Sequence, residues 1–156
     1  MVLDDLDIAI LKILEDDARV SYRKIAQKLN VSVGTIHNRI SKLHENEIIK
    51  GFLLELNERK LNYKLKTVIS LVITGIKIDE ILKKISNYPH VTNVYNISGS
   101  VSAIVICRFQ KMKQIRDFTT FLNEEKDVLK VETNIVLNVY KEDTHHLLSF
   151  DSTPEK

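Results

Sequence analysis

The chain is poor in the features that mark secreted, disulfide-stabilised and membrane-spanning proteins. Its single cysteine, Cys107, excludes an intramolecular disulfide and is typical of a reducing compartment. Because this cysteine lies in an apolar strand pattern, we expect a small buried side chain. No apolar run approaches the roughly 18 residues that a membrane span requires, and the first 20 residues carry acids instead of a signal-peptide pattern. These absences favour a cytoplasmic protein with no membrane partner.

The sequence also lacks motifs of catalysis and metal binding. It has no glycine-rich phosphate loop and no histidine pair spaced as in a metalloprotease helix. His37, His44 and His90 have no obvious carboxylate or cysteine partner. His145 and His146 are adjacent, so their side chains would diverge from a strand, and we interpret them as part of a polar tail. We therefore predict that the chain is not an enzyme and has no catalytic residue, metal site or cofactor.

Acidic side chains are missing from one window of the chain. Residues 18–44 carry six lysine or arginine side chains and no aspartate or glutamate, whereas acids cluster at 4–7 and 15–17. The net charge of the whole chain is only +2, so this segregation makes a local positive field that the net charge hides. The length of 156 residues and the hydrophobic fraction of 44% allow a real core in one domain or two small ones.

The basic window has the pattern of a helix-turn-helix. Capping residues and apolar spacing predict helices over about residues 4–16, 21–29 and 32–45. Ala26 is small where two helices must cross closely, and Asn30 tolerates the left-handed backbone that a tight turn needs. A short basic helix pair of this kind is suited to enter the major groove of DNA.

The third predicted helix has a buried stripe and an opposite polar face. At about 100° per residue, one stripe contains Val33, Ile36, Ile40 and Leu43. On the outer face, Asn38 can pair with adenine and the Thr35 methyl group can touch thymine, while Lys42 suits phosphates. The predicted DNA-binding residues are Ser21, Tyr22, Arg23, Ser32, Gly34, Thr35, His37, Asn38, Arg39, Ser41 and Lys42. A solvated helix also shows a polar face, and Arg39 could equally pair with an acid of its own domain.

The segment after the third helix is expected to join two domains. Residues 48–56 read as a strand with an interruption at Gly51, and residues 57–66 are polar and charged. The predicted divisions are a DNA-binding domain at 1–50, a linker strand and hinge at 51–66, a sensing and dimerisation domain at 67–142, and a tail at 143–156.

The predicted elements of the second half follow the order β-α-β-β-α-β, which is the ferredoxin-like arrangement. Apolar periodicity predicts a strand at 67–76, a helix from 78 to about 88, strands at 90–97 and 101–109, a helix at 112–122 and a strand at 131–139. Several strands carry bulky side chains on both faces, and an exposed apolar sheet face usually marks an interface. We expect two copies to pack sheet on sheet, which would present two recognition helices to DNA half-sites.

Several short motifs accompany this domain order. They are Leu3-Asp4-Asp5-Leu6-Asp7, Ile10, Leu14, Asp17-Ala18-Arg19, Ile25-Ala26, Val31-Ser32, Arg39-Ile40, Leu43, Ile48-Ile49 and Gly51. Together they resemble the leucine-responsive regulatory protein/AsnC (Lrp/AsnC) family of transcription regulators over almost the whole chain. The resemblance implies an α+β protein with a winged helix-turn-helix, a linker strand and a ferredoxin-like (ACT-like) sensing domain. It also implies dimers that can assemble into octamers, and frequently an amino-acid effector held between sensing domains.

The resemblance places an effector-binding turn between the second and third sensing strands. The family's turn usually reads Thr-Gly-x-x-Asp, whereas here Ser98-Gly99-Ser100-Val101-Ser102 occupies it. An aspartate could pair with an α-ammonium group, but Ser102 offers only a neutral hydrogen bond, which is roughly half as strong. The implied effector residues are Gly99, Ser100, Val101, Ser102, Thr133 and Ile135. The alternative is a turn kept only for its geometry.

We interpret the chain as a sequence-specific transcription regulator that binds pseudo-palindromic double-stranded DNA as a homodimer or larger oligomer. An amino acid or related small molecule is the candidate effector. A non-specific DNA-packaging protein is the alternative, because it would use the same basic face without discriminating between bases. A metabolite sensor with a vestigial DNA-binding half is a third interpretation, against which the intact basic window argues.

Overall fold

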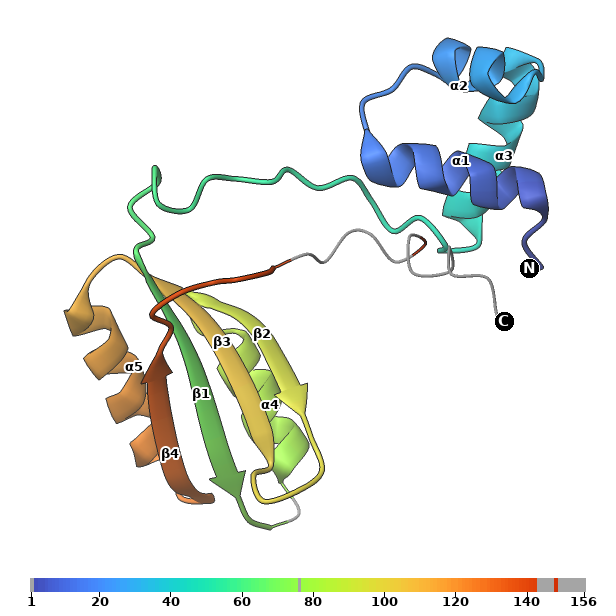
Figure 1. Cartoon of the computed structure of the whole chain (residues 1–156). Coiled ribbons are helices and arrows are strands. Elements are labelled where there is room, and N and C mark those ends of the chain that lie inside the picture. The colour runs from blue at the N-terminus through green and yellow to red at the C-terminus, as the bar shows by residue number, and fades with distance from the viewer. Residues whose placement is uncertain (1, 76, 143–147, 149–156) are drawn as a thin grey trace, which may run out of the picture. The chain divides into compact units, whose positions relative to one another are not determined.

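The computed structural model describes residues 2–75, 77–142 and 148. The chain divides into two compact units (Figure 1). The first contains the chain up to Glu55 and the described residues from Lys141 onward, and the second spans Leu56–Tyr140. The residues predicted as linker and hinge, 51–66, are divided between the two units. Each unit has a hydrophobic core of its own.

The described part of the first unit is built from three helices. They are α1 (Asp5–Asp16), α2 (Tyr22–Leu29) and α3 (Val33–Glu45). The side chains of Asp4, Ser21 and Ser32 cap these helices by accepting backbone N–H groups of the first turns, as the sequence predicts. Asn30, between α2 and α3, has the left-handed backbone (φ 54°, ψ 46°) that the turn motif requires. The helix-turn-helix prediction is confirmed.

The apolar stripes of the three helices meet in one core. Its buried residues are Ile10, Leu14, Ile25, Ala26, Ile36, Ile40 and Leu43. The prediction that Val33 belongs to the buried stripe of α3 is wrong, because this residue is 47% exposed. Val33 is the first residue of α3, and helical side chains lean toward the helix N-terminus. Its side chain therefore lies beyond the packed part of the helix.

The strand predicted over residues 48–56 does not form in this chain. The backbone N–H groups of Ile48 and Ile49 both donate to the Leu43 carbonyl at the end of α3. The residues that follow make no strand pairing, and Leu53 is 81% exposed. A β-branched and apolar run becomes a strand only where a neighbouring backbone supplies hydrogen bonds, and this segment has no such neighbour within the described chain.

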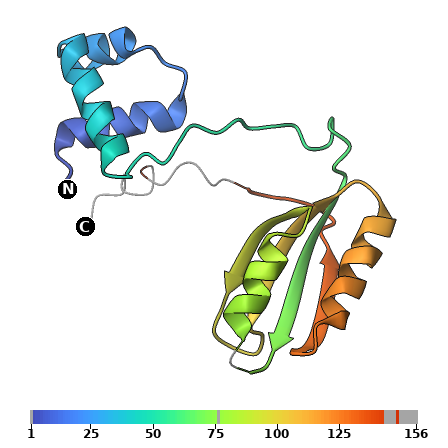
Figure 2. The same ribbon diagram turned by 180° about the vertical axis from the view of Figure 1, so that it is seen from behind.

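The second unit has the predicted order β-α-β-β-α-β. Its elements are β1 (Leu65–Ile73), α4 (Ile78–Ser86), β2 (Val91–Asn96), β3 (Ala103–Phe109), α5 (Met112–Glu124) and β4 (Val128–Ile135). The strands form one antiparallel sheet in the order β2-β3-β1-β4. Figure 2 shows α4 and α5 lying on the same face of this sheet. The ferredoxin-like prediction is confirmed.

The last strand lies earlier in the chain than predicted. β4 ends at Ile135, which pairs with Thr67 near the start of β1. The apolar alternation predicts a strand up to Val139, but Leu137 and Val139 follow the end of the ladder and are 87% and 53% exposed. One further bond, from the Val136 N–H to the Lys66 carbonyl, follows β4 next to the start of β1.

Alternate residues of the two central strands lie on opposite faces of the sheet. On the helix side, Ile69 of β1 and Phe109 of β3 are fully buried, as is Cys107. The buried thiol confirms the expectation for the cysteine, and burial raises its pKa to about 11. The open face carries half-buried apolar residues at its centre, namely Val68, Val72, Ile104 and Ile106. The predicted apolar second face is therefore present.

The chain that leads into β1 is bonded to the sheet. Arg108 Nε of β3 lies 2.7 Å from both carboxylate oxygens of Glu58. Gln110 Nε2 donates to the Leu61 carbonyl at 3.2 Å. Residues 58–61 are therefore fixed to the second unit, and the segment before them connects this unit to α3.

Candidate DNA interface and sensing turn

The start of α2 and the outer face of α3 form one surface. Gly34, His37, Asn38 and Lys42 are exposed on α3, and Ser41 is half-buried beside them. The Tyr22 ring at the start of α2 packs edge-on against the His37 ring, with 6.1 Å between the ring centres. Predicted DNA contacts from both helices of the motif are thus neighbours in space, which is the arrangement that a groove-binding helix pair requires.

Exposed cations lie on the same two helices. Arg23, Lys24 and Lys28 of α2 and Lys42 of α3 are all exposed. None of the four has a carboxylate partner among the residues that the structure describes. Their charges are therefore available to phosphates, which contribute affinity but no sequence preference.

The predicted hydroxyl contacts are used by the helix starts themselves. Ser21 Oγ accepts the Lys24 N–H at 3.3 Å, and Ser32 Oγ accepts the Thr35 N–H at 3.0 Å. The hydroxyl groups of Ser32 and Thr35 also share a hydrogen bond of 2.8 Å. These groups fix the start of each helix, and their direct contact with DNA stays a prediction.

Arg39 differs from the other predicted contacts because it has partners inside its own unit. Its Nη1 lies 2.6 Å from Asp4 Oδ2, and 3.2 and 3.3 Å from the two carboxylate oxygens of Asp7. The pKa of Asp4 is lowered by the Asp7 backbone N–H and then by Arg39, and Asp4 in turn raises the pKa of Arg39. The charge of Arg39 is thus met by two carboxylates in this structure, and its contact with phosphate stays a prediction.

The sensing turn has the backbone geometry that its glycine allows. Gly99 has φ 128°, a conformation that residues with a Cβ rarely adopt. Ser102 Oγ accepts the Ile73 N–H at 2.9 Å and donates to the Ile73 carbonyl at 3.1 Å. The Ser102 N–H donates to the Leu71 carbonyl at 2.7 Å. The Ser102 hydroxyl therefore holds the end of β1, and both its donor and an acceptor position are in use.

The predicted effector residues do not meet in one chain. Ser102 is bonded to the last residues of β1, whereas Ile135 pairs with Thr67 near the beginning of that strand. Thr133 lies on the helix side of the sheet, where its hydroxyl is 3.5 Å from that of Thr119. Ile135 is 41% exposed. One chain alone supplies two separated parts of the predicted site.

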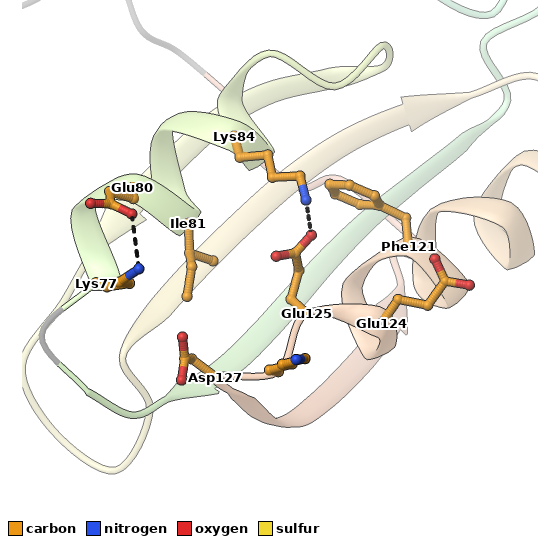
Figure 3. Close-up of a pocket in the computed structure, with 9 residues that line it drawn as sticks. Lys77, Glu80, Ile81, Lys84, Phe121, Glu124, Glu125 and Asp127 are labelled. Atoms are coloured by element: carbon orange, nitrogen blue, oxygen red, sulfur yellow. Dashed lines mark hydrogen bonds and ion pairs between the residues drawn. The ribbon is translucent and has the colours of Figure 1, made fainter.

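The structure reveals a groove that the motifs do not predict. A cavity of about 570 Å³ lies between α4 and α5 (Figure 3). Its lining residues are Lys77, Glu80, Ile81, Lys84, Phe121, Glu124, Glu125, Lys126 and Asp127. Lys84 forms an ion pair with Glu125 and lies 5.3 Å from the centre of the Phe121 ring. The sequence signal for this groove is the charged residues along α4 and after the end of α5. In the sequence alone, they cannot be told from an ordinary solvated surface.

Two family models cover nearly the whole chain. Residues 3–50 match a model described as winged helix-turn-helix DNA-binding, and residues 68–145 match the Lrp/AsnC ligand binding domain. The chain belongs to the Lrp/AsnC family. The resemblance expected from the sequence is thereby confirmed, and the Lrp/AsnC chain is a transcriptional regulator with a DNA-binding and a ligand-binding domain.

Known proteins are similar to the chain over most of its length. An HTH-type transcriptional regulator of Pyrococcus furiosus is 43% identical to the Lrp/AsnC chain, with 92% of this chain and 97% of the relative covered. The structure of Escherichia coli AsnC is 25% identical with a TM-score of 0.85, covering 92% and 98% of the two chains. A Neisseria meningitidis regulator solved as an L-methionine complex is 20% identical with a TM-score of 0.87, covering 96% and 99%.

These relatives are named as regulators of transcription and not as enzymes. Nothing in the comparisons supports the DNA-packaging alternative. No helix in the described part of the Lrp/AsnC chain is long and apolar enough to cross a membrane. Within the same part, no group of three or more histidine, cysteine, aspartate or glutamate side chains is arranged to hold a metal ion. His145 and His146 lie outside the described residues.

Proposed function

We propose that this regulator binds pseudo-palindromic double-stranded DNA as a homodimer, with α3 of each protomer in the major groove. The supporting observation is the exposed surface of Tyr22, His37 and Asn38, together with exposed cations on the same two helices that have no carboxylate partner among the described residues. Asn38 acts as a base reader because its amide can pair with adenine. Lys42 and Arg23 act as phosphate contacts that set the register of the helix.

The dimer forms through the open face of the sensing sheet. Val68 and Val72 of β1 and Ile104 and Ile106 of β3 give this face an apolar centre that the helices do not cover. A second copy buries it by packing sheet on sheet. The proposal extends to assembly of dimers into octamers, as the family resemblance implies. The regulator acts in the cytoplasm, and no enzymatic step is part of its function.

An amino acid is the proposed effector. The ligand-binding family model and the L-methionine complex of the Neisseria regulator support this class of ligand. Gly99 and Ser100 are exposed in the sensing turn, whereas the Ser102 hydroxyl is committed to Ile73. The ligand therefore contacts the turn mainly through backbone groups. Because Ile135 lies toward the other end of β1, a second copy completes the site.

Selection of bound duplexes from a random pool, with full-length protein, tests this function. The selected site is then compared with random DNA, and the comparison is repeated with each amino acid added. We expect the selected site to bind on the order of 10³-fold or more tightly than random DNA, and one amino acid to change that affinity. A ratio near one supports packaging instead, and no binding to any duplex in dilute buffer overturns the proposal.

A further inference from the structure

Two carboxylates from the start of α1 converge on one guanidinium group of α3. Arg39 Nη1 is within 3.3 Å of oxygen atoms of both Asp4 and Asp7. The two acids also bind each other's backbone in a capping box, since Asp4 Oδ1 accepts the Asp7 N–H and Asp7 Oδ2 accepts the Asp4 N–H. The three side chains thus join the first turn of α1 to the middle of α3.

The carboxylate of Asp7 cannot be satisfied by water. Asp7 is 1% exposed, whereas the side chain of Asp4 is 50% exposed. A buried charge is tolerated when it is paired and hydrogen-bonded, and removal of its partner is strongly unfavourable. Arg39 supplies the only cation within ion-pair distance of Asp7 among the described residues. The pairing therefore favours one rotation of α3 about its axis, the one that brings Arg39 over α1.

That rotation also sets the direction of the proposed DNA-binding residues. Asn38 precedes Arg39 directly, and Lys42 follows three residues later on a neighbouring face of the same helix. We propose that Arg39 is a positioning residue, which fixes α3 against α1 through Asp7 and so aims Asn38 and Lys42 at the DNA. This inference rests on the proposed function, because the orientation of Asn38 and Lys42 matters only if α3 binds DNA.

Removal of both buried charges separates this role from a direct phosphate contact. The double variant Asp7→Asn/Arg39→Met leaves no unpaired buried charge, and asparagine keeps a side-chain oxygen for the Asp4 N–H. We expect Arg39→Met alone to bind the selected site at least tenfold more weakly. The double variant lacks the same pairing without leaving a buried charge alone, so it should also bind the selected site more weakly, with an unchanged dependence of affinity on salt.

The control is Lys42→Met, which should lower the salt slope by about 0.9 for each phosphate that the variant no longer neutralises. If Arg39 binds phosphate, the salt slope of both variants falls as in the control, and that result overturns the inference. A double variant that binds as tightly as the wild type also overturns it, because the pairing is then not needed to position α3. Should Arg39→Met fail to fold, as judged by circular dichroism, the double variant against wild type gives the same decision. A wild type that binds no duplex refutes the proposed function itself, whereas a binding wild type with a double variant of wild-type affinity or of reduced salt slope refutes only the role of Arg39.

Discussion

The Ser102 hydroxyl offers a sharp test of how the sensing turn is built. Its Oγ accepts the Ile73 N–H and donates to the Ile73 carbonyl, at 2.9 and 3.1 Å. Ile73 is 7% exposed, so water cannot fully replace these two bonds. The change Ser102→Ala removes both bonds and leaves the rest of the turn unaltered.

The expected loss follows from the two bonds. A hydrogen bond of this kind contributes about 0.5–1.5 kcal/mol net, so Ser102→Ala should lower the free energy of unfolding of the sensing unit by about 2 kcal/mol. For a unit of this size that corresponds to a fall in Tm of about 10 °C. The Ile73 amide should also lose its protection, because its acceptor has gone.

Thermal unfolding followed by circular dichroism measures the first effect, and hydrogen exchange of the Ile73 amide measures the second. Ser100→Ala is the matched control, because Ser100 is exposed in the same turn and has no hydrogen-bond partner among the described residues. It should change stability by no more than about 0.5 kcal/mol. If the two variants unfold alike and Ile73 stays protected, Ser102 does not hold β1 and is free to bind an effector.

Three other predictions concern DNA, assembly and the thiol. Asn38→Ala should lower the affinity ratio of selected to random DNA, whereas Lys42→Ala should weaken binding to all duplexes and reduce the salt slope by about one unit. Identical anisotropy titrations of the two variants would contradict the division into a base reader and a phosphate contact. Ile104→Glu should convert dimers to monomers in light scattering, and a wild type that is already monomeric at micromolar concentration would remove the sheet pairing. Because burial raises the pKa of the Cys107 thiol to about 11, the folded state keeps this proton while the unfolded state loses it. Stability should therefore fall as pH rises from about 9 to 11, less so in Cys107→Ala, as measured by urea unfolding.

Local signals in the sequence predicted the helices well. Asp4, Ser21 and Ser32 cap the helices that they were expected to cap, because a cap depends only on groups within three residues. The left-handed turn at Asn30 is equally local. The order of strands along the chain followed from apolar periodicity, which is clearest in β1 and β3, where alternate residues are buried against the helices.

Features that depend on distant partners were predicted less well. The apolar residues at 48–56 lack a neighbouring backbone within the described chain, so their strand propensity is not realised. Arg39 could be a phosphate contact or an ion-pair partner as long as the position of α1 was unknown, because Asp4 lies 35 residues away along the chain. Similarly, the turn motif could not show that Ser102 binds Ile73 across the sheet.

The hydrogen bonds of Glu58 and Leu61 to the sheet have a consequence for operator architecture. Because Ile49 is bonded to the end of α3 and Glu58 to Arg108, residues 50–57 form a tether, which fully extended reaches about 25–30 Å. In the proposed dimer, one tether runs from each copy of the paired sheets to its own α3. The length of the tethers should therefore limit how far apart the two DNA half-sites can be. We therefore expect operator spacing to depend on a stretch of chain in which no DNA-binding or effector residue is predicted.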